Sequence, residues 1–194
     1  MESLQDRQSI AGSSKGGSVS GGFGGISGVS VNAGKTSGEK VWVNQLTGIN
    51  GRESIRVNVG GTTTLTGASI TNVDANGIDQ GNLVLNTQHL VLNDIVDIDT
   101  FDTTTVGIGT SNGKGIDPKL SSGTYTNNNK DKEQITRATI GKGTINTGST
   151  TGVLNRDITK IQEITKDESL NTEFYVSDKT LALVKNPSGE IAVL

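Results

Sequence analysis

The chain contains no cysteine and a single histidine, His89. Without cysteine it can form neither a disulfide framework nor a thiolate metal site, and one histidine leaves too few ligands for zinc. His89 is also the one available centre for nucleophilic catalysis with a histidine base, but it lies inside a strand-like alternation between Gln88 and Leu90. We therefore expect it to be an outward-facing polar strand residue. The chain is accordingly predicted to be non-enzymatic, with no catalytic, cofactor-binding or metal-binding residues.

Apolar and aromatic residues are also scarce. Aromatic residues make up 3% of the chain and hydrophobic residues 31%, which is too little to fill a thick globular core. No apolar run approaches the roughly 18 residues of a membrane span, and the polar N-terminus lacks the pattern of a signal peptide. Lysine and arginine number 17 against 20 acidic residues, for a net charge of -3, which argues against a nucleic-acid partner.

Glycine, threonine, serine and asparagine instead occupy nearly half of the positions. Such a chain can fill a thin core in which each repeat packs only on its neighbours. Short apolar alternations, separated by turn signals such as Asn50-Gly51, recur over 41–105. Ile49, Ile70 and Leu90 are 21 and 20 residues apart, Val57 and Ile78 are 21 apart, and Leu65 and Leu85 are 20 apart. This period predicts a β-solenoid with parallel coils of about 20 residues. An antiparallel sandwich is the competing architecture. The residues expected to point inward are Ile49, Val57, Leu65, Ile70, Leu83, Leu85, Leu90 and Leu92.

Four aspartates, Asp94, Asp97, Asp99 and Asp102, form an acidic run. They lack the spacing of calcium-binding loops, and Asp97 and Asp99 share one strand face, so we interpret the run as a solvated face. Gly34-Lys35-Thr36 lacks the preceding glycine and the flanking strand and helix of a phosphate-binding loop. Gly22-Phe23-Gly24 fails the dinucleotide fingerprint because Ser27 stands where that motif requires its third glycine.

The remaining segments carry weaker signals. Residues 9–38 fit either a flexible Gly/Ser linker or weak strands, and 111–133 fits a mobile polar connector. Spacings of 4, 3 and 3 among apolar residues predict a helix over 154–168, followed by a hairpin over 172–184. We expect 154–194 to fold back as a cap on the last coil or as a compact unit beside it. Leu4-Gln5-Asp6 and Leu92-Asn93-Asp94 each precede a stretch that reads as an insertion after a coil.

Several strings resemble the haemagglutinin repeat region of filamentous haemagglutinin-type exoproteins, and especially of contact-dependent growth inhibition effectors. They lie at 4–6, 29–35, 44–49, 61–68 and 81–83. A second set, at 140–145, 154–158 and 162–167, resembles the segment that follows the repeats in those proteins. The expected organisation is then repeats over 1–110, a connector over 111–133 and a post-repeat segment over 134–194.

The resemblance implies an all-β fold, a right-handed parallel β-helix with a small mixed C-terminal segment. It also implies a non-enzymatic segment of a secreted filament on a Gram-negative cell surface, serving adhesion or toxin delivery. The implied partners are an outer-membrane two-partner transporter and a target-cell receptor. The family's export and toxin domains have no counterpart here, as expected of a fragment or of the product of a split gene. A standalone secreted effector or toxin-associated domain remains the alternative.

Overall fold

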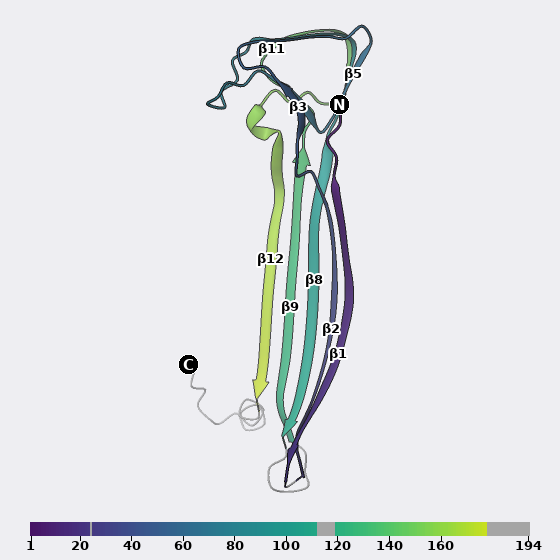
Figure 1. The fold of residues 1–194 in the computed structure, drawn as a ribbon, viewed down its shortest axis with the longest axis vertical. Coiled ribbons are helices and arrows are strands. Elements are labelled where there is room, and N and C mark those ends of the chain that lie inside the picture. Colours follow the sequence, from purple (N-terminus) through teal and green to yellow (C-terminus); the bar gives the residue numbers. More distant parts are fainter. Residues whose placement is uncertain (24, 112–118, 178–194) are drawn as a thin grey trace, which may run out of the picture. The chain divides into compact units, whose positions relative to one another are not determined.

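The computed structural model describes residues 1–23, 25–111 and 119–177, and this part of the chain is all-β, as predicted. Its one helical element is a single 3-10 turn, η1 (Ile158–Lys160). The strands, in chain order, are β1 (Asp6–Gly22), β2 (Gly25–Trp42), β3 (Thr47–Asn50), β4 (Ile55–Asn58), β5 (Thr62–Thr66), β6 (Ala68–Thr71), β7 (Leu83–Asn93), β8 (Ile95–Ser111), β9 (Lys119–Thr136), β10 (Thr139–Ile140), β11 (Gly143–Thr151) and β12 (Gln162–Ser177) (Figure 1).

The chain forms two compact units, each assembled from separated segments. The first unit comprises Met1–Gln8, Glu39–Asp99 and Asp131–Asp167, and the second comprises Ser9–Gly38, Thr100–Lys130 and Glu168–Leu194. These units differ from the consecutive segments 1–110, 111–133 and 134–194 suggested by the sequence, because the long strands β1, β2, β8, β9 and β12 each contribute residues to both units.

Short parallel strands build the first unit. One sheet has the order β10-β6-β3, and the other has the order β11-β7-β4 with β5 also paired to β7. Ile70 lies between Ile49 and Ile140, and Leu85 lies between Val57 and Ile145, all in parallel register. The same three stretches of chain thus lie side by side twice, first as β3, β6 and β10 and then as β4, β7 and β11.

The predicted spacing is right for one pair and wrong for three. Ile49 pairs with Ile70, as the 21-residue spacing indicates. Ile70, however, pairs with Ile140 rather than with Leu90. Val57 pairs with Leu85 rather than Ile78, and Leu65 pairs with Leu92 rather than Leu85. The cause of these last two differences is a long loop, residues 72–82, between β6 and β7, whereas only four residues separate β3 from β4. An inserted loop shifts every later pairing without disturbing the alternation of the strands.

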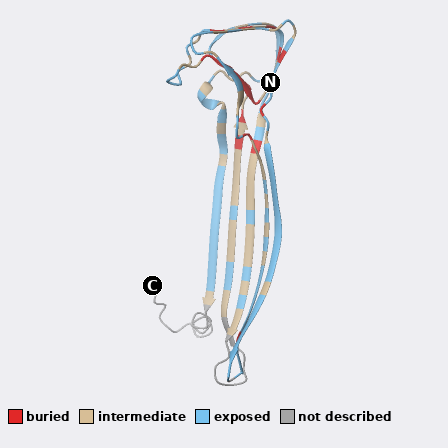
Figure 2. Ribbon diagram, viewed as in Figure 1, coloured by how far each residue is buried: buried red, intermediate tan, exposed pale blue. Residues whose placement is uncertain are grey.

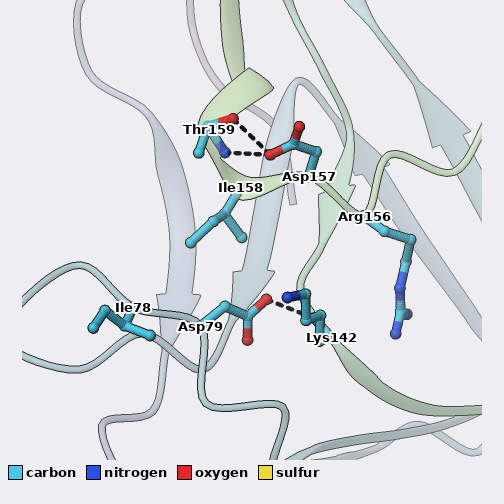
Figure 3. A pocket seen from close by; sticks show the side chains of 7 residues that line it. All are labelled: Ile78, Asp79, Lys142, Arg156, Asp157, Ile158 and Thr159. Atoms are coloured by element: carbon cyan, nitrogen blue, oxygen red, sulfur yellow. Dashed lines mark hydrogen bonds between the residues drawn. The ribbon is translucent and has the colours of Figure 1, made fainter.

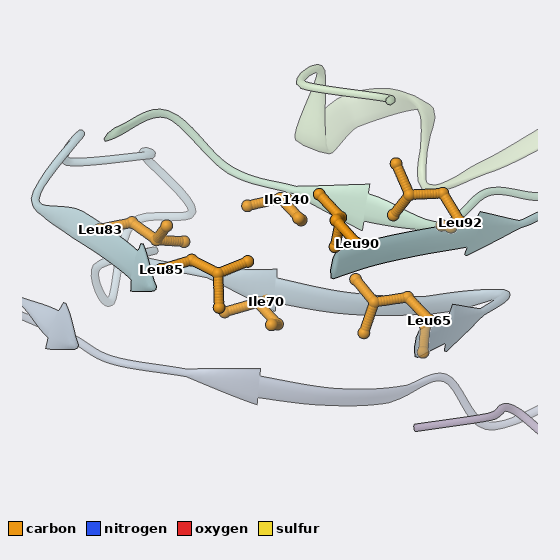
Figure 4. Close-up of a cluster of buried hydrophobic side chains, with 9 residues drawn as sticks. Leu65, Ile70, Leu83, Leu85, Leu90, Leu92 and Ile140 are labelled. Carbon is orange, nitrogen blue, oxygen red and sulfur yellow. The ribbon is translucent and has the colours of Figure 1, made fainter. Parts of the chain in front are cut away.

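A small leucine-rich core lies between these strands (Figure 4). Six of the residues predicted to point inward are buried: Leu65, Ile70, Leu83, Leu85, Leu90 and Leu92. Val57 is partly buried against them, but the prediction is wrong for Ile49, which is 44% exposed. Because β3 is the last strand of its sheet, only one side of Ile49 receives a neighbouring side chain among the described residues. The buried residues appear as short red stretches in Figure 2; β6 is buried along its whole length, whereas β3 and β4 contain no buried residue.

Glycines allow β11 to approach β7 closely. Gly143 has φ 139°, and a Cβ there would lie 2.1 Å from the carbonyl oxygen of Leu83. Gly152 has φ 93°, and its Cβ would lie 1.9 Å from the carbonyl oxygen of Leu92. Both conformations exclude a side chain, so glycine is required at each end of this strand.

Long antiparallel strands build the second unit. Its strands belong to the sheet β1-β2-β8-β9-β12, and neighbouring strands run in opposite directions (Figure 1). Residues 9–22 and 25–38 therefore lie in strands β1 and β2 rather than in a linker. The mobile connector expected over 111–133 is wrong for its described part, because β9 begins at Lys119. Threonine and asparagine side chains suit a sheet that is open to solvent, and Thr104 donates to Asn127 at 3.3 Å.

The helix expected over 154–168 is also wrong. Only η1 is helical there, and β12 begins at Gln162. Threonine and isoleucine favour the extended backbone, and the edge of β9 offers a partner for it. Of the expected cap, Leu154 packs against the core and Asn155 bridges to Thr139, whereas β12 joins the long sheet instead of covering the short parallel strands. Residues 178–184 of the expected hairpin, and the rest of the cap to 194, lie outside the described residues.

Candidate functional site

Asp97 is fully buried, which corrects the prediction of a solvated acidic face. Its Oδ1 accepts hydrogen bonds from Gln5 Nε2 at 2.8 Å and from the Val43 amide at 3.1 Å. Its Oδ2 accepts from Gln134 Nε2 at 2.9 Å and from Thr136 Oγ1 at 2.7 Å. The burial of these two neighbours is the reverse of what a solvated acidic face requires: the Asp97 side chain is buried, whereas that of Val96 is 61% exposed.

The donors to Asp97 come from three separate stretches of the first unit. Gln5 precedes β1, Val43 follows β2, and Gln134 and Thr136 lie at the end of β9. Gln162, at the start of β12, extends this group by donating to the Val43 carbonyl at 3.0 Å. A buried carboxylate is tolerated only when such donors satisfy it. Asp97 on β8 thus ties together the ends of β1, β2, β8 and β9, and Gln162 adds β12 through the Val43 carbonyl. The described part of the chain holds no group of three or more side chains arranged to bind a metal ion.

The other aspartates of the run lie nearer the surface. Asp94 accepts from the Ala138 amide at 2.9 Å and pairs with Arg137 at 3.4 Å, and Asp99 pairs with Lys40 at 3.8 Å. Asp102 is exposed, as predicted. Arg137 also contacts Glu163 at 2.6 Å. The hydrogen bond from Arg137 lowers the pKa of Glu163, and the same bond raises the pKa of Arg137.

His89 is exposed on β7, as predicted, and its Nδ1 lies 2.8 Å from Ser149 Oγ on the neighbouring β11. A catalytic triad needs an acid on the other ring nitrogen, and no carboxylate contacts the ring within the described residues. Gly34-Lys35-Thr36 is extended chain inside β2, where the hydroxyl of Thr36 hydrogen-bonds that of Thr103. The segment therefore forms no phosphate-binding loop.

The structure adds a cavity of about 440 Å³ that the sequence did not indicate. It lies in the first unit, where three connecting segments of the chain meet (Figure 3). Ile78 and Asp79 come from the loop between β6 and β7, Lys142 from the turn between β10 and β11, and residues 156–159 from the segment after β11. These residues are too far apart in the sequence to form a recognisable motif. The site therefore becomes visible only when the pairing of the strands is known.

Two carboxylates and two cations line this cavity. Asp79 accepts the Lys142 amide at 2.7 Å and the Gly81 amide at 3.2 Å. Arg156 donates to the Gly143 carbonyl at 2.7 Å, and partial burial lowers the pKa of its guanidinium. Asp157 Oδ1 accepts the amide and the hydroxyl of Thr159, at 3.0 and 2.6 Å, and these bonds lower its pKa. The charged groups are thus held in fixed positions by the backbone.

Comparisons with family models, with curated proteins and with solved structures each found no match to this chain. Its described part also contains no helix that is long and apolar enough to cross a membrane. Inferences about its role therefore rest on the residues and on their arrangement.

Proposed function

We propose that the chain is a non-enzymatic segment of a secreted surface filament of a Gram-negative bacterium, serving adhesion or toxin delivery. In this proposal the first unit is a short right-handed parallel β-helix. The observation that carries the proposal is the parallel alignment of Ile49, Ile70 and Ile140 from three separate stretches of chain. A fold that grows by adding equivalent coils gives an extended body without a thick core.

An amide ladder supports the same interpretation. Asn86 donates from Nδ2 to Asn58 Oδ1 at 2.5 Å, and Asn146 donates from Nδ2 to Asn86 Oδ1 at 2.6 Å. Identical side chains at one position on three neighbouring strands are typical of stacked coils. The resemblance of the sequence to haemagglutinin repeats adds the surface location, the two-partner transporter and the target-cell receptor to the proposal.

Cell binding by the purified chain tests the proposal. Fluorescently labelled protein should bind Gram-negative target cells saturably, and an excess of unlabelled protein should displace it. A Leu85→Asp variant, in which a buried core residue becomes charged, serves as the unfolded control and should not bind.

Two results would contradict the proposal. One is the absence of saturable binding to any target cell tested. The other is growth arrest when the chain is produced inside a bacterium, which would favour the standalone effector instead.

A further inference from the structure

We infer that the cavity beside Lys142 and Arg156 is a binding site for an acidic sugar, a small polyhydroxylated ligand with one carboxylate. The inference does not depend on the filament proposal, because it follows from the chemistry of the cavity alone. Its volume, about 440 Å³, lies within the range of small-molecule pockets, roughly 300–1,000 Å³.

The positive groups provide the place for the ligand's carboxylate. The ammonium group of Lys142 makes no hydrogen bond or ion pair with the described part of the chain. Arg156 uses one nitrogen, Nη2, for the Gly143 carbonyl and retains other donors. Because its guanidinium is partly buried, an incoming carboxylate meets a cation that has already lost some of its water.

The carboxylates of the cavity select for hydroxyl groups. Both oxygens of Asp79 already accept a backbone N–H, and Asp157 Oδ1 accepts two donors from Thr159. Asp157 Oδ2 has no partner in the described part of the chain. Oxygens whose charge is already shared with other donors suit neutral O–H groups, since they still have lone pairs to offer.

The cavity is also organised before any ligand arrives. Asp74 Oδ1 accepts the amides of Asn76 and Ile78 at 2.8 and 2.9 Å, and its Oδ2 accepts Gln80 Nε2 at 2.9 Å. Gly77 adopts φ 80° within the same loop. These bonds fix the position of Ile78, which is 59% exposed at the cavity and offers an apolar surface for the carbon face of a sugar ring. A site that is already ordered loses little conformational entropy when a ligand binds to it.

Titration of the isotope-labelled full chain with D-glucuronate, followed by NMR, tests the inference. Amide signals of Lys142, Arg156 and Thr159 should shift saturably. D-Glucose, which lacks the carboxylate, and L-alanine, which replaces the hydroxyls with an ammonium group, should each bind at least about tenfold more weakly.

Variants then locate the site. Lys142→Gln should weaken glucuronate binding about tenfold or more, whereas Lys35→Gln, an exposed lysine of β2, should leave it unchanged. Because the Lys142 ammonium holds nothing in place, its loss should leave the fold intact, which the unperturbed amide spectrum would confirm. The inference is overturned if glucuronate shifts no cavity signal at millimolar concentration. Equal binding of glucose, tighter binding of alanine or an unaffected Lys142→Gln variant would also overturn it.

Discussion

Replacing Asp97 with asparagine should destabilise the protein far more than any surface change of the same kind. The variant keeps the size of the side chain but exchanges one carboxylate oxygen for an NH₂ group. The oxygen that faces Gln5 and Val43 can be retained, whereas the NH₂ group then faces Gln134 Nε2 and Thr136 Oγ1. Both hydrogen bonds to the charged acceptor on this side are lost in a fully buried place, and Thr136 Oγ1 can regain only a neutral one by accepting from the NH₂ group.

The size of the effect follows from these two bonds. A hydrogen bond to a charged group contributes about 1.5–3 kcal/mol and a neutral one about 1 kcal/mol, so two losses and one neutral replacement should lower the free energy of unfolding by roughly 2–5 kcal/mol. With a urea dependence of about 2 kcal/mol per molar, the unfolding midpoint should fall by roughly 2 M.

Fluorescence of the single tryptophan reports this unfolding directly. Trp42 precedes Val43 in the chain, and the ammonium groups of Lys40 and Lys132 each lie 5.9 Å from the centre of its ring. The matched control is Asp102→Asn on exposed β8, which should change stability by no more than about 0.5 kcal/mol. If both variants unfold at the same urea concentration, the assigned role of Asp97 is wrong.

Three further changes test other parts of the structure. Leu85→Ala should lower the unfolding free energy by about 3–5 kcal/mol in the same urea assay, whereas Ile49→Ala, at an edge position, should cost less than about 1 kcal/mol. Gly143→Ala should lower the thermal midpoint and the near-ultraviolet dichroism, because its Cβ would collide with the Leu83 carbonyl; a midpoint equal to that of the parent protein would contradict the close packing. The pKa of Glu163 is lowered in the folded protein, so its pairing with Arg137 stabilises the fold above the unfolded pKa and is lost as pH falls through the folded value. In Arg137→Gln, the carboxyl pKa of Glu163 measured by NMR should rise towards its ordinary value, and an unchanged pKa would exclude the pairing.

The sequence predicted the parts of the fold that depend on local alternation. Leu83, Leu85, Leu90 and Leu92 alternate with polar residues, and a strand with this pattern must bury its apolar face. The prediction of a helix over 154–168 was wrong because the local spacing did not decide the structure there. Its spacing suited a helix, but a partner strand more than twenty residues away decided the outcome.

The candidate sites were hidden for a different physical reason. Asp97 looks solvated in sequence because its donors, such as Gln5 and Gln134, lie far from it along the chain. The cavity likewise combines Asp79, Lys142 and Arg156, which only the stacking of three stretches brings together. In this chain local pattern predicts the strands, whereas the long loop between β6 and β7 decides which strands become neighbours.

Cysteine cross-linking tests the parallel stacking of separated stretches most directly, because the natural chain contains no cysteine. Asn86 and Asn146 are neighbours in register, and their side chains are in contact. A chain carrying Asn86→Cys and Asn146→Cys should form an intramolecular disulfide under mild oxidation, since registered residues on adjacent strands lie within bonding range. The control pair, Asn86→Cys with Thr144→Cys, is displaced by two positions and should cross-link much more slowly. Equal cross-linking of the two pairs, or none of the first, would contradict the parallel register of β7 and β11.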